Sequence, residues 1–157
     1  MKIRLVSVFT MFFGLLLAGP QWAVSQESSA GSTLEVHLSY TGSGTVDDKH
    51  KIYVVLWDSP AFVSGGEVMP LELQPLTTKQ GTVTFSNVKK SPAYVSAAYD
   101  PKGEWAGQSA PPDGSSLGLY SKTPGKPEPI DIEAGKAASI ELSFDDSVKM
   151  QAGHATK

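Results

Sequence analysis

The sequence predicts an all-β protein, an antiparallel β-sandwich of seven or eight short strands. Apolar and polar residues alternate with a period of two in several segments, of which Thr33 to Tyr40 is the first, and this alternation is typical of half-buried strands. Clusters of Gly, Pro, Ser and Asp separate these segments. No window of helix length shows the three-to-four spacing and caps of an amphipathic helix, which favours a sandwich over mixed folds.

The first 25 residues have the features of an export signal. Lys2 and Arg4 form a positive start, Leu5 to Leu17 form an apolar run, and Ala23-Val24-Ser25 offers a small-x-small cleavage pattern. We therefore expect a signal peptide over 1–25, a flexible leader over 26–32, a β-sandwich domain over 33–147 and a flexible tail over 148–157. The expected location is the periplasm or the secreted fraction.

The composition of the chain after residue 25 argues against several classes of function. This part keeps 11 of the 13 basic residues and all 16 acidic residues, so its formal charge is −5, and it holds no arginine. Both features argue against nucleic-acid binding, because phosphate recognition relies on basic side chains. The absence of cysteine excludes thiol catalysis, iron–sulfur clusters and blue-copper ligation. No later apolar run has transmembrane length, so we expect no membrane insertion after signal cleavage.

The first half of the domain contains three distinct strand patterns. In Thr33 to Tyr40 the apolar residues fall on one face only. Ile52 to Trp57 is apolar at every position, which predicts a central strand covered on both faces. Residues 67–76 contain Pro70 and Pro75, which cannot donate to a ladder, so we expect an edge strand there.

The second half continues with strands around one long loop. We expect strands at residues 81–85, 94–99, 117–121, 128–133 and 138–144. Residues 100–118 are dominated by Gly, Pro, Ser and Asp and predict a long loop, the kind of segment that often carries function.

A catalytic interpretation of this loop is weak. Gly114 to Gly118 matches G-x-S-x-G with Ser116 in the serine position, but a nucleophile elbow needs a helix after the serine and a short strand follows here. We interpret the motif as a turn that enters a strand. The sequence predicts no catalytic residue.

Metal binding is also disfavoured by residue spacing. His37, His50 and His154 share no ligand spacing, although copper can use histidine together with methionine. Asp100 and Glu104 have Lys102 between them, which suits a tight turn better than a calcium site. We expect no metal and no cofactor.

Trp105 is the main candidate for ligand contact. It lies in a glycine-flanked loop segment, and exposed aromatics on such loops stack on sugar rings or anchor protein partners. The alternative is that Trp105 folds back over the open end of the sandwich. The candidate contact surface consists of Trp105, Tyr120, Asp100 and Glu104, and the expected partner is a protein or a carbohydrate.

Four segments carry a resemblance to a known family: His50 to Phe62, Gly81 to Asp100, Glu128 to Gly135 and Ala138 to Phe144. In these segments the chain resembles small exported bacterial β-sandwich domains related to carboxypeptidase regulatory-like, or transthyretin-like, domains. The resemblance implies a Greek-key, Ig-like sandwich without catalytic residues of its own. Some relatives have an acidic, asparagine-rich loop where this chain has Pro101, Lys102 and Trp105.

Three functions follow as expectations. The leading one is a non-catalytic exported binding or accessory module. The alternative is a structural or assembly protein of the cell envelope, and the third is a metal- or carbohydrate-binding protein. An enzyme would need the scattered histidines and acids to converge in the fold.

Overall fold

The computed structural model describes residues 31–65 and 68–151. The predicted signal peptide, most of the leader and residues 152–157 of the tail lie outside these ranges. The described residues form seven strands and one short 3₁₀ helix. They are β1 (Ser32–Tyr40), β2 (Ile52–Trp57), η1 (Pro60–Ser64), β3 (Glu72–Leu76), β4 (Gln80–Val88), β5 (Tyr94–Tyr99), β6 (Ser116–Leu119) and β7 (Ala137–Phe144).

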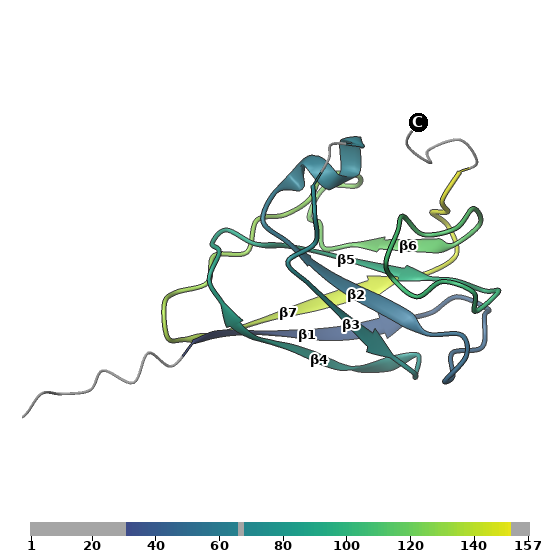
Figure 1. Cartoon of the computed structure of the whole chain (residues 1–157), viewed down its shortest axis with the longest axis horizontal. Helices are drawn as coiled ribbons and strands as arrows, with labels where there is room; N and C mark the ends of the chain where they lie inside the picture. Colours follow the sequence, from purple (N-terminus) through teal and green to yellow (C-terminus); the bar gives the residue numbers. More distant parts are fainter. Residues whose placement is uncertain (1–30, 66–67, 152–157) are drawn as a thin grey trace, which may run out of the picture.

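The strands build two sheets that pack face to face (Figure 1). One sheet has three strands in the order β4-β1-β7, and the other has four in the order β3-β2-β5-β6. The prediction of an all-β chain with two packed sheets is confirmed. β3, which contains Pro75, lies at the edge of its sheet, as the prolines indicate.

One strand pair differs from the antiparallel prediction. β1 and β7 run parallel, with Thr33 opposite Ala137 and Tyr40 opposite Phe144. Both strands alternate with the same period, so a parallel register places their apolar residues on the same face as well as an antiparallel one would. Side-chain alternation carries no information about strand direction, and this is why the sequence did not reveal the pairing.

The core lies between the sheets and is made of the inward residues of each strand. β1 supplies four side chains that are each 0–3% exposed, in agreement with its predicted alternation. The other large members come from β2, β4, β5 and β7 and from residues 130–132. The core cluster includes Leu34, Val36, Leu38, Tyr40, Ile52, Val54, Leu56, Val83, Phe85, Val95, Tyr99, Ile130, Ile132, Ile140, Leu142 and Phe144.

Two segments differ from their predicted structure. Residues 128–133 form no strand but make one bridge, Ala93 with Ile130, while Ile130 and Ile132 enter the core. Pro127 and Pro129 explain this, because neither can donate to a ladder. The helix η1 was not predicted. The Ser59 side chain caps it by accepting a hydrogen bond from the Ala61 backbone N–H, and Pro60 stands in its first turn.

The start of the predicted flexible tail is paired. Lys149 forms an antiparallel bridge with Ser116, and Met150 donates its backbone N–H to the carbonyl of Ser115 at 2.8 Å. Residues 148–150 thereby extend the four-stranded sheet beyond β6.

Candidate functional site

The outer faces of the two sheets differ sharply in polarity. Residues paired across neighbouring strands share a face, so the register gives the composition of each face. On the three-stranded sheet the outer residues of the central strand and its partners are polar or small: Thr33, Glu35, His37, Ser39, Gln80, Thr82, Thr84, Ala137, Ser139, Glu141 and Ser143. On the four-stranded sheet they are almost all apolar or aromatic: Tyr53, Val55, Trp57, Leu73, Pro75, Tyr94, Ser96, Ala98, Leu117 and Leu119.

One end of this apolar outer face is covered by the loop that follows β5. Trp105 packs edge-on against Tyr53 of β2, with ring centroids 4.9 Å apart and an interplanar angle of 73°. Gly107 approaches Leu73 of β3 so closely that a Cβ would lie 2.6 Å from its side chain. Val55 and Ala98 on the same face are 5% and 3% exposed. The prediction that β2 is buried on both faces is therefore confirmed at this end.

The Asp100 carboxylate organises the covering loop. It is 2% exposed and accepts backbone N–H groups from Lys102 at 2.9 Å, Glu104 at 2.8 Å and Trp105 at 2.9 Å. Burial raises the pKa of Asp100, but the three N–H donors outweigh burial and hold the pKa below its usual range. Trp105 also donates its indole N–H to the carbonyl of Ser109 at 3.1 Å.

These contacts show where the four contact residues predicted from the sequence lie. Trp105 is only 9% exposed, so it folds back as the alternative expected, but it lies on the outer face of the four-stranded sheet against Tyr53 and not over the open end of the sandwich. Asp100 is occupied by the loop backbone, and Glu104 is exposed beside it. Tyr120 lies at the opposite end of β5, where its N–H bonds to the carbonyl of Val95 and its ring packs on the inner core. The four residues therefore do not form one surface.

The other end of the apolar face is less covered. The rings of Trp57 and Phe62 stack with centroids 4.6 Å apart and an angle of 7°, and the Trp57 indole N–H donates to the Ser96 hydroxyl at 2.9 Å. Tyr94 lies directly across from Trp57 in the β2–β5 register. η1 and the loop over residues 100–115, which we call the Trp105 loop, thus occupy opposite ends of the four-stranded sheet (Figure 1).

Three exposed apolar side chains belong to the chain segments next to this aromatic stack. Val63 follows Phe62 in η1 and is 47% exposed, Met69 is 82% exposed and Leu71 is 41% exposed. Leu71 is held beside Trp57, because its N–H donates to the carbonyl of Leu56 at 2.8 Å. We call the set Trp57, Phe62, Val63, Met69, Leu71 and Tyr94 the Trp57 patch. The sequence predicts Trp57 only as the last residue of a strand covered on both faces and does not reveal the patch, although the unbroken apolar run of β2 is a signal for it.

A polar cluster closes the far end of the sandwich. Asp146 accepts hydrogen bonds from the hydroxyls of Tyr40 and Ser116, each at 2.6 Å, and from the Ser43 N–H at 2.8 Å. Lys149 lies 3.6 Å from the same carboxylate and donates to the Ser116 hydroxyl at 3.1 Å. We call these five residues the Asp146 clasp. Because β1 and β6 belong to different sheets, the clasp joins the two sheets.

The clasp shifts the titration of two of its members. Hydrogen bonds from Ser116, Tyr40 and Ser43 hold the pKa of Asp146 well below its usual range. Burial and the hydrogen bond to Asp146 raise the pKa of Tyr40 to about 12. Ser116, the serine of the G-x-S-x-G match, is fully buried within strand β6 and bound to a carboxylate, so it is not placed as a nucleophile.

The histidines that the structure describes lie apart from one another. His37, on the polar face of β1, is hydrogen-bonded to the Thr82 hydroxyl at 2.8 Å, and His50 contacts Asp47 at 2.9 Å in the loop before β2. His154 lies outside the described residues. Among residues 31–65 and 68–151, no three His, Cys, Asp or Glu side chains are grouped as metal ligands.

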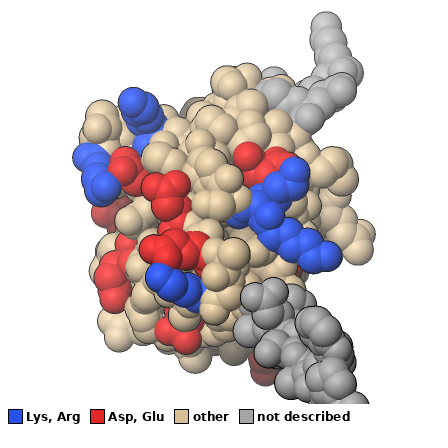
Figure 2. Space-filling view, turned by 90° about the vertical axis from the view of Figure 1, so that its left-hand side faces the viewer, with Lys and Arg blue, Asp and Glu red and all other residues tan. Residues whose placement is uncertain are grey.

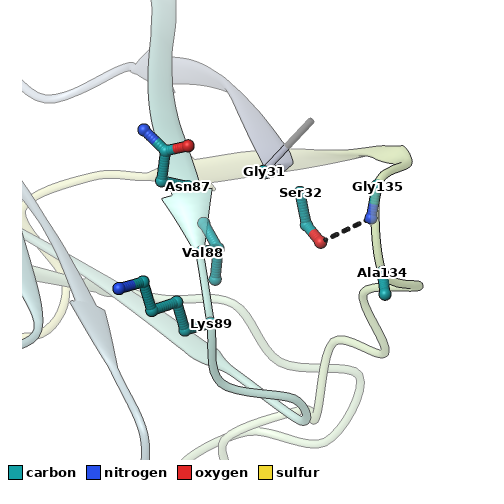
Figure 3. Close-up of a pocket in the computed structure, with 7 residues that line it drawn as sticks. All are labelled: Gly31, Ser32, Asn87, Val88, Lys89, Ala134 and Gly135. Carbon is teal, nitrogen blue, oxygen red and sulfur yellow. Dashed lines mark hydrogen bonds between the residues drawn. The ribbon is translucent and has the colours of Figure 1, made fainter. Parts of the chain in front are cut away.

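A hollow of about 470 Å³ lies where β1 begins (Figure 3). Its lining is Gly31, Ser32, Asn87, Val88, Lys89, Ala134 and Gly135. The Ser32 hydroxyl is already occupied, since it donates to the Glu133 carbonyl and accepts from the Gly135 N–H, both at 3.1 Å. Acidic and basic side chains are interspersed over the end of the molecule that Figure 2 shows, so this end has no single-sign surface.

No family model, curated protein or solved structure matches this chain. Among the residues that the structure describes, no helix is long and apolar enough to cross a membrane.

Proposed function

We propose that this protein is a non-catalytic binding module of the periplasm or secreted fraction, which binds a protein partner through the Trp57 patch. The observation that carries the proposal is the exposure of Val63, Met69 and Leu71 beside the Trp57–Phe62 stack. The outer face of the other sheet is polar, so the apolar side chains gather on one side of the molecule. Exposed apolar side chains that gather on one side of a small domain are characteristic of interaction sites.

The form of the patch favours a protein over a carbohydrate. Sugar rings stack on an open aromatic plane, whereas Trp57 is stacked on Phe62 and Trp105 is buried against Tyr53. The most exposed members of the patch are a methionine and two aliphatic residues. Methionine is common at protein-binding surfaces because its flexible, polarizable side chain adapts to a partner.

The proposal includes no chemistry because the reactive groups that the structure buries or binds, Ser116, Asp146 and Asp100, serve the fold. Ser116 and Asp146 belong to the clasp, and Asp100 holds the Trp105 loop. Export and the relation to carboxypeptidase regulatory-like sandwiches are parts of the same proposal. They are supported by the charged start and apolar run before residue 25 and by two facing all-β sheets.

Site-specific photo-crosslinking tests the proposal. A benzophenone amino acid replaces Met69 in the patch or, as a matched control, Thr82 on the exposed polar face of β4. In cells that make the protein, we expect a discrete crosslinked partner from position 69 and none from position 82. The same species from both positions, or none from position 69, would contradict the assignment. A crosslink to a second copy would favour the assembly alternative.

A further inference from the structure

The chain places its own C-terminal segment on the edge of β6. Leu117 donates its N–H to the carbonyl of Val148 at 2.8 Å, Met150 donates to Ser115 at 2.8 Å, and Gly114 donates to Met150 at 2.9 Å. These are main-chain contacts of the kind by which an extended peptide adds a strand to a sheet. Residues 148–150 therefore occupy a strand-addition site along residues 114–117.

One side chain of the segment is recognised specifically. The Lys149 ammonium group donates to the Ser116 hydroxyl at 3.1 Å and lies 3.6 Å from the Asp146 carboxylate. Val148, by contrast, is 57% exposed. The site thus holds an extended backbone with a cation at one position, and the side chain before that cation points largely to solvent.

The two edges of this sheet differ in their capacity to pair. β3 at the opposite edge carries Pro75, which lacks an N–H and protects that edge. The edge at residues 114–117 has no proline, and both its donors and its acceptor are used by the C-terminal segment. It is an edge built for pairing, and the present occupant is a short segment near the end of the chain.

We propose that the 114–117 edge, together with Ser116 and Asp146, is a peptide-binding site for an extended, lysine-containing segment of a partner protein, and that residues 148–150 occupy it in its absence. The partner segment takes the place of Val148, Lys149 and Met150 and reproduces their main-chain hydrogen bonds. Its lysine binds Asp146 and Ser116 as Lys149 does. This site lies at the Tyr99 end of β5, whereas the Trp57 patch lies at the Tyr94 end.

Binding of a synthetic peptide to the full chain tests this site. The peptide is acetylated and amidated Ser147–Gln151 (SVKMQ), and the binding protein is the variant Met150→Pro, which lacks the N–H that donates to Ser115. We expect this variant to bind the peptide at least about tenfold more tightly than the unsubstituted chain, since its own segment no longer competes. In ¹⁵N spectra the amides of Gly114 and Leu117 should shift.

The lysine requirement supplies the control. A peptide with alanine in place of lysine should bind about tenfold more weakly, because it lacks the charge-assisted contact. If Met150→Pro does not fold by circular dichroism, Lys149→Glu takes its place, since its carboxylate repels Asp146. Absence of binding by a folded variant would overturn the proposal, and so would equal binding by the variant and the unsubstituted chain. Either result leaves the role of the Trp57 patch untouched.

Discussion

Ser115 and Ser116 are neighbours in sequence, and both are fully buried, yet their hydroxyl groups have opposite environments. Ser116 donates to Asp146 and accepts from Lys149. The Ser115 hydroxyl has no hydrogen-bond partner within the described chain. A buried hydroxyl without a partner costs free energy, whereas one bound to a carboxylate stabilises the fold.

The two serines therefore make a matched pair for mutagenesis. Ser116→Ala should lower the free energy of unfolding by about 1–3 kcal/mol, because Asp146 loses a charge-assisted hydrogen bond. Ser115→Ala should leave it unchanged or raise it by up to about 1 kcal/mol. Urea unfolding followed by tryptophan fluorescence measures both. Equal destabilisation by the two variants would show that the clasp contributes no specific stability.

The carboxylates of Asp146 and Asp100 should make the protein sensitive to acid. Both pKa values lie below the usual 3.8, so the unfolded chain binds more protons than the folded chain once the pH falls toward that value. Their stabilising effect is present above about pH 4 and is lost progressively below it. The free energy of unfolding, measured in urea from pH 7 to pH 2, should fall mainly below about pH 4.

Asp146→Asn supplies the test of that acid dependence. This variant should be less stable at pH 7 and should lose less stability on acidification than the unsubstituted chain. Asp131→Asn, which makes the same substitution at an exposed loop carboxylate, is the control. If the free energy of unfolding of Asp146→Asn falls on acidification as steeply as that of the unsubstituted chain, other groups govern acid unfolding.

At the residue scale, the sequence predicted side-chain burial better than side-chain role. The inward residues of β1 follow from alternation alone, because one face of a strand must meet the core. Asp100 and Trp105 are predicted as contact residues because both lie in the long loop over residues 100–118. Only the fold reveals that three backbone N–H groups converge on Asp100 and place Trp105 on Tyr53.

At the scale of elements, Gly118 determines how closely β6 approaches β7. It lies within β6 and is buried, and a Cβ at this position would lie 2.7 Å from the Phe144 ring. The two strands belong to different sheets, so this contact sets the separation of the sheets at one side. Phe144 is itself in contact with Tyr40, with ring centroids 4.9 Å apart.

Gly118→Ala should therefore destabilise the protein by overpacking. We expect a loss of about 1–3 kcal/mol in the free energy of unfolding, because Phe144 cannot move without disturbing Tyr40. Ser86→Ala, at an exposed position of β4, should change it by less than about 0.5 kcal/mol. Thermal denaturation compares the variants, and an unchanged midpoint for Gly118→Ala would show that the sheets adjust freely.

Most strands could be predicted from period-two patterns, but their partners could not. The parallel β1–β7 pair joins segments about a hundred residues apart, and nothing local encodes its direction. The 128–133 segment is predicted as a strand, yet Pro129 and the adjacent Pro127 limit it to a single bridge. The pairing of residues 148–150 escaped notice because their contacts are mainly main-chain contacts, which leave no side-chain pattern.

At the scale of the whole molecule, the outer faces of the two sheets differ in polarity. The three-stranded sheet presents Ser, Thr, Glu and His on its outer face, the composition expected of a sheet face that meets water. On the four-stranded sheet, the Trp105 loop covers one end of the apolar outer face, and the Trp57 patch lies at the other end. The unbroken apolar run of β2 indicated double coverage, and the loop supplies only part of it.

The most direct test of the Trp57 patch is the oxidation rate of Met69 in cells that make the protein and in the purified protein. Met69 is 82% exposed in the isolated chain, so dilute peroxide should convert it readily to the sulfoxide, and mass spectrometry of peptides measures the rate. The variant Thr82→Met supplies the internal reference, on the exposed polar face of β4. We predict that Met69, relative to the methionine at position 82, is oxidised at least about tenfold more slowly in cells, because a partner covers the patch. An equal relative rate in both settings would contradict the account.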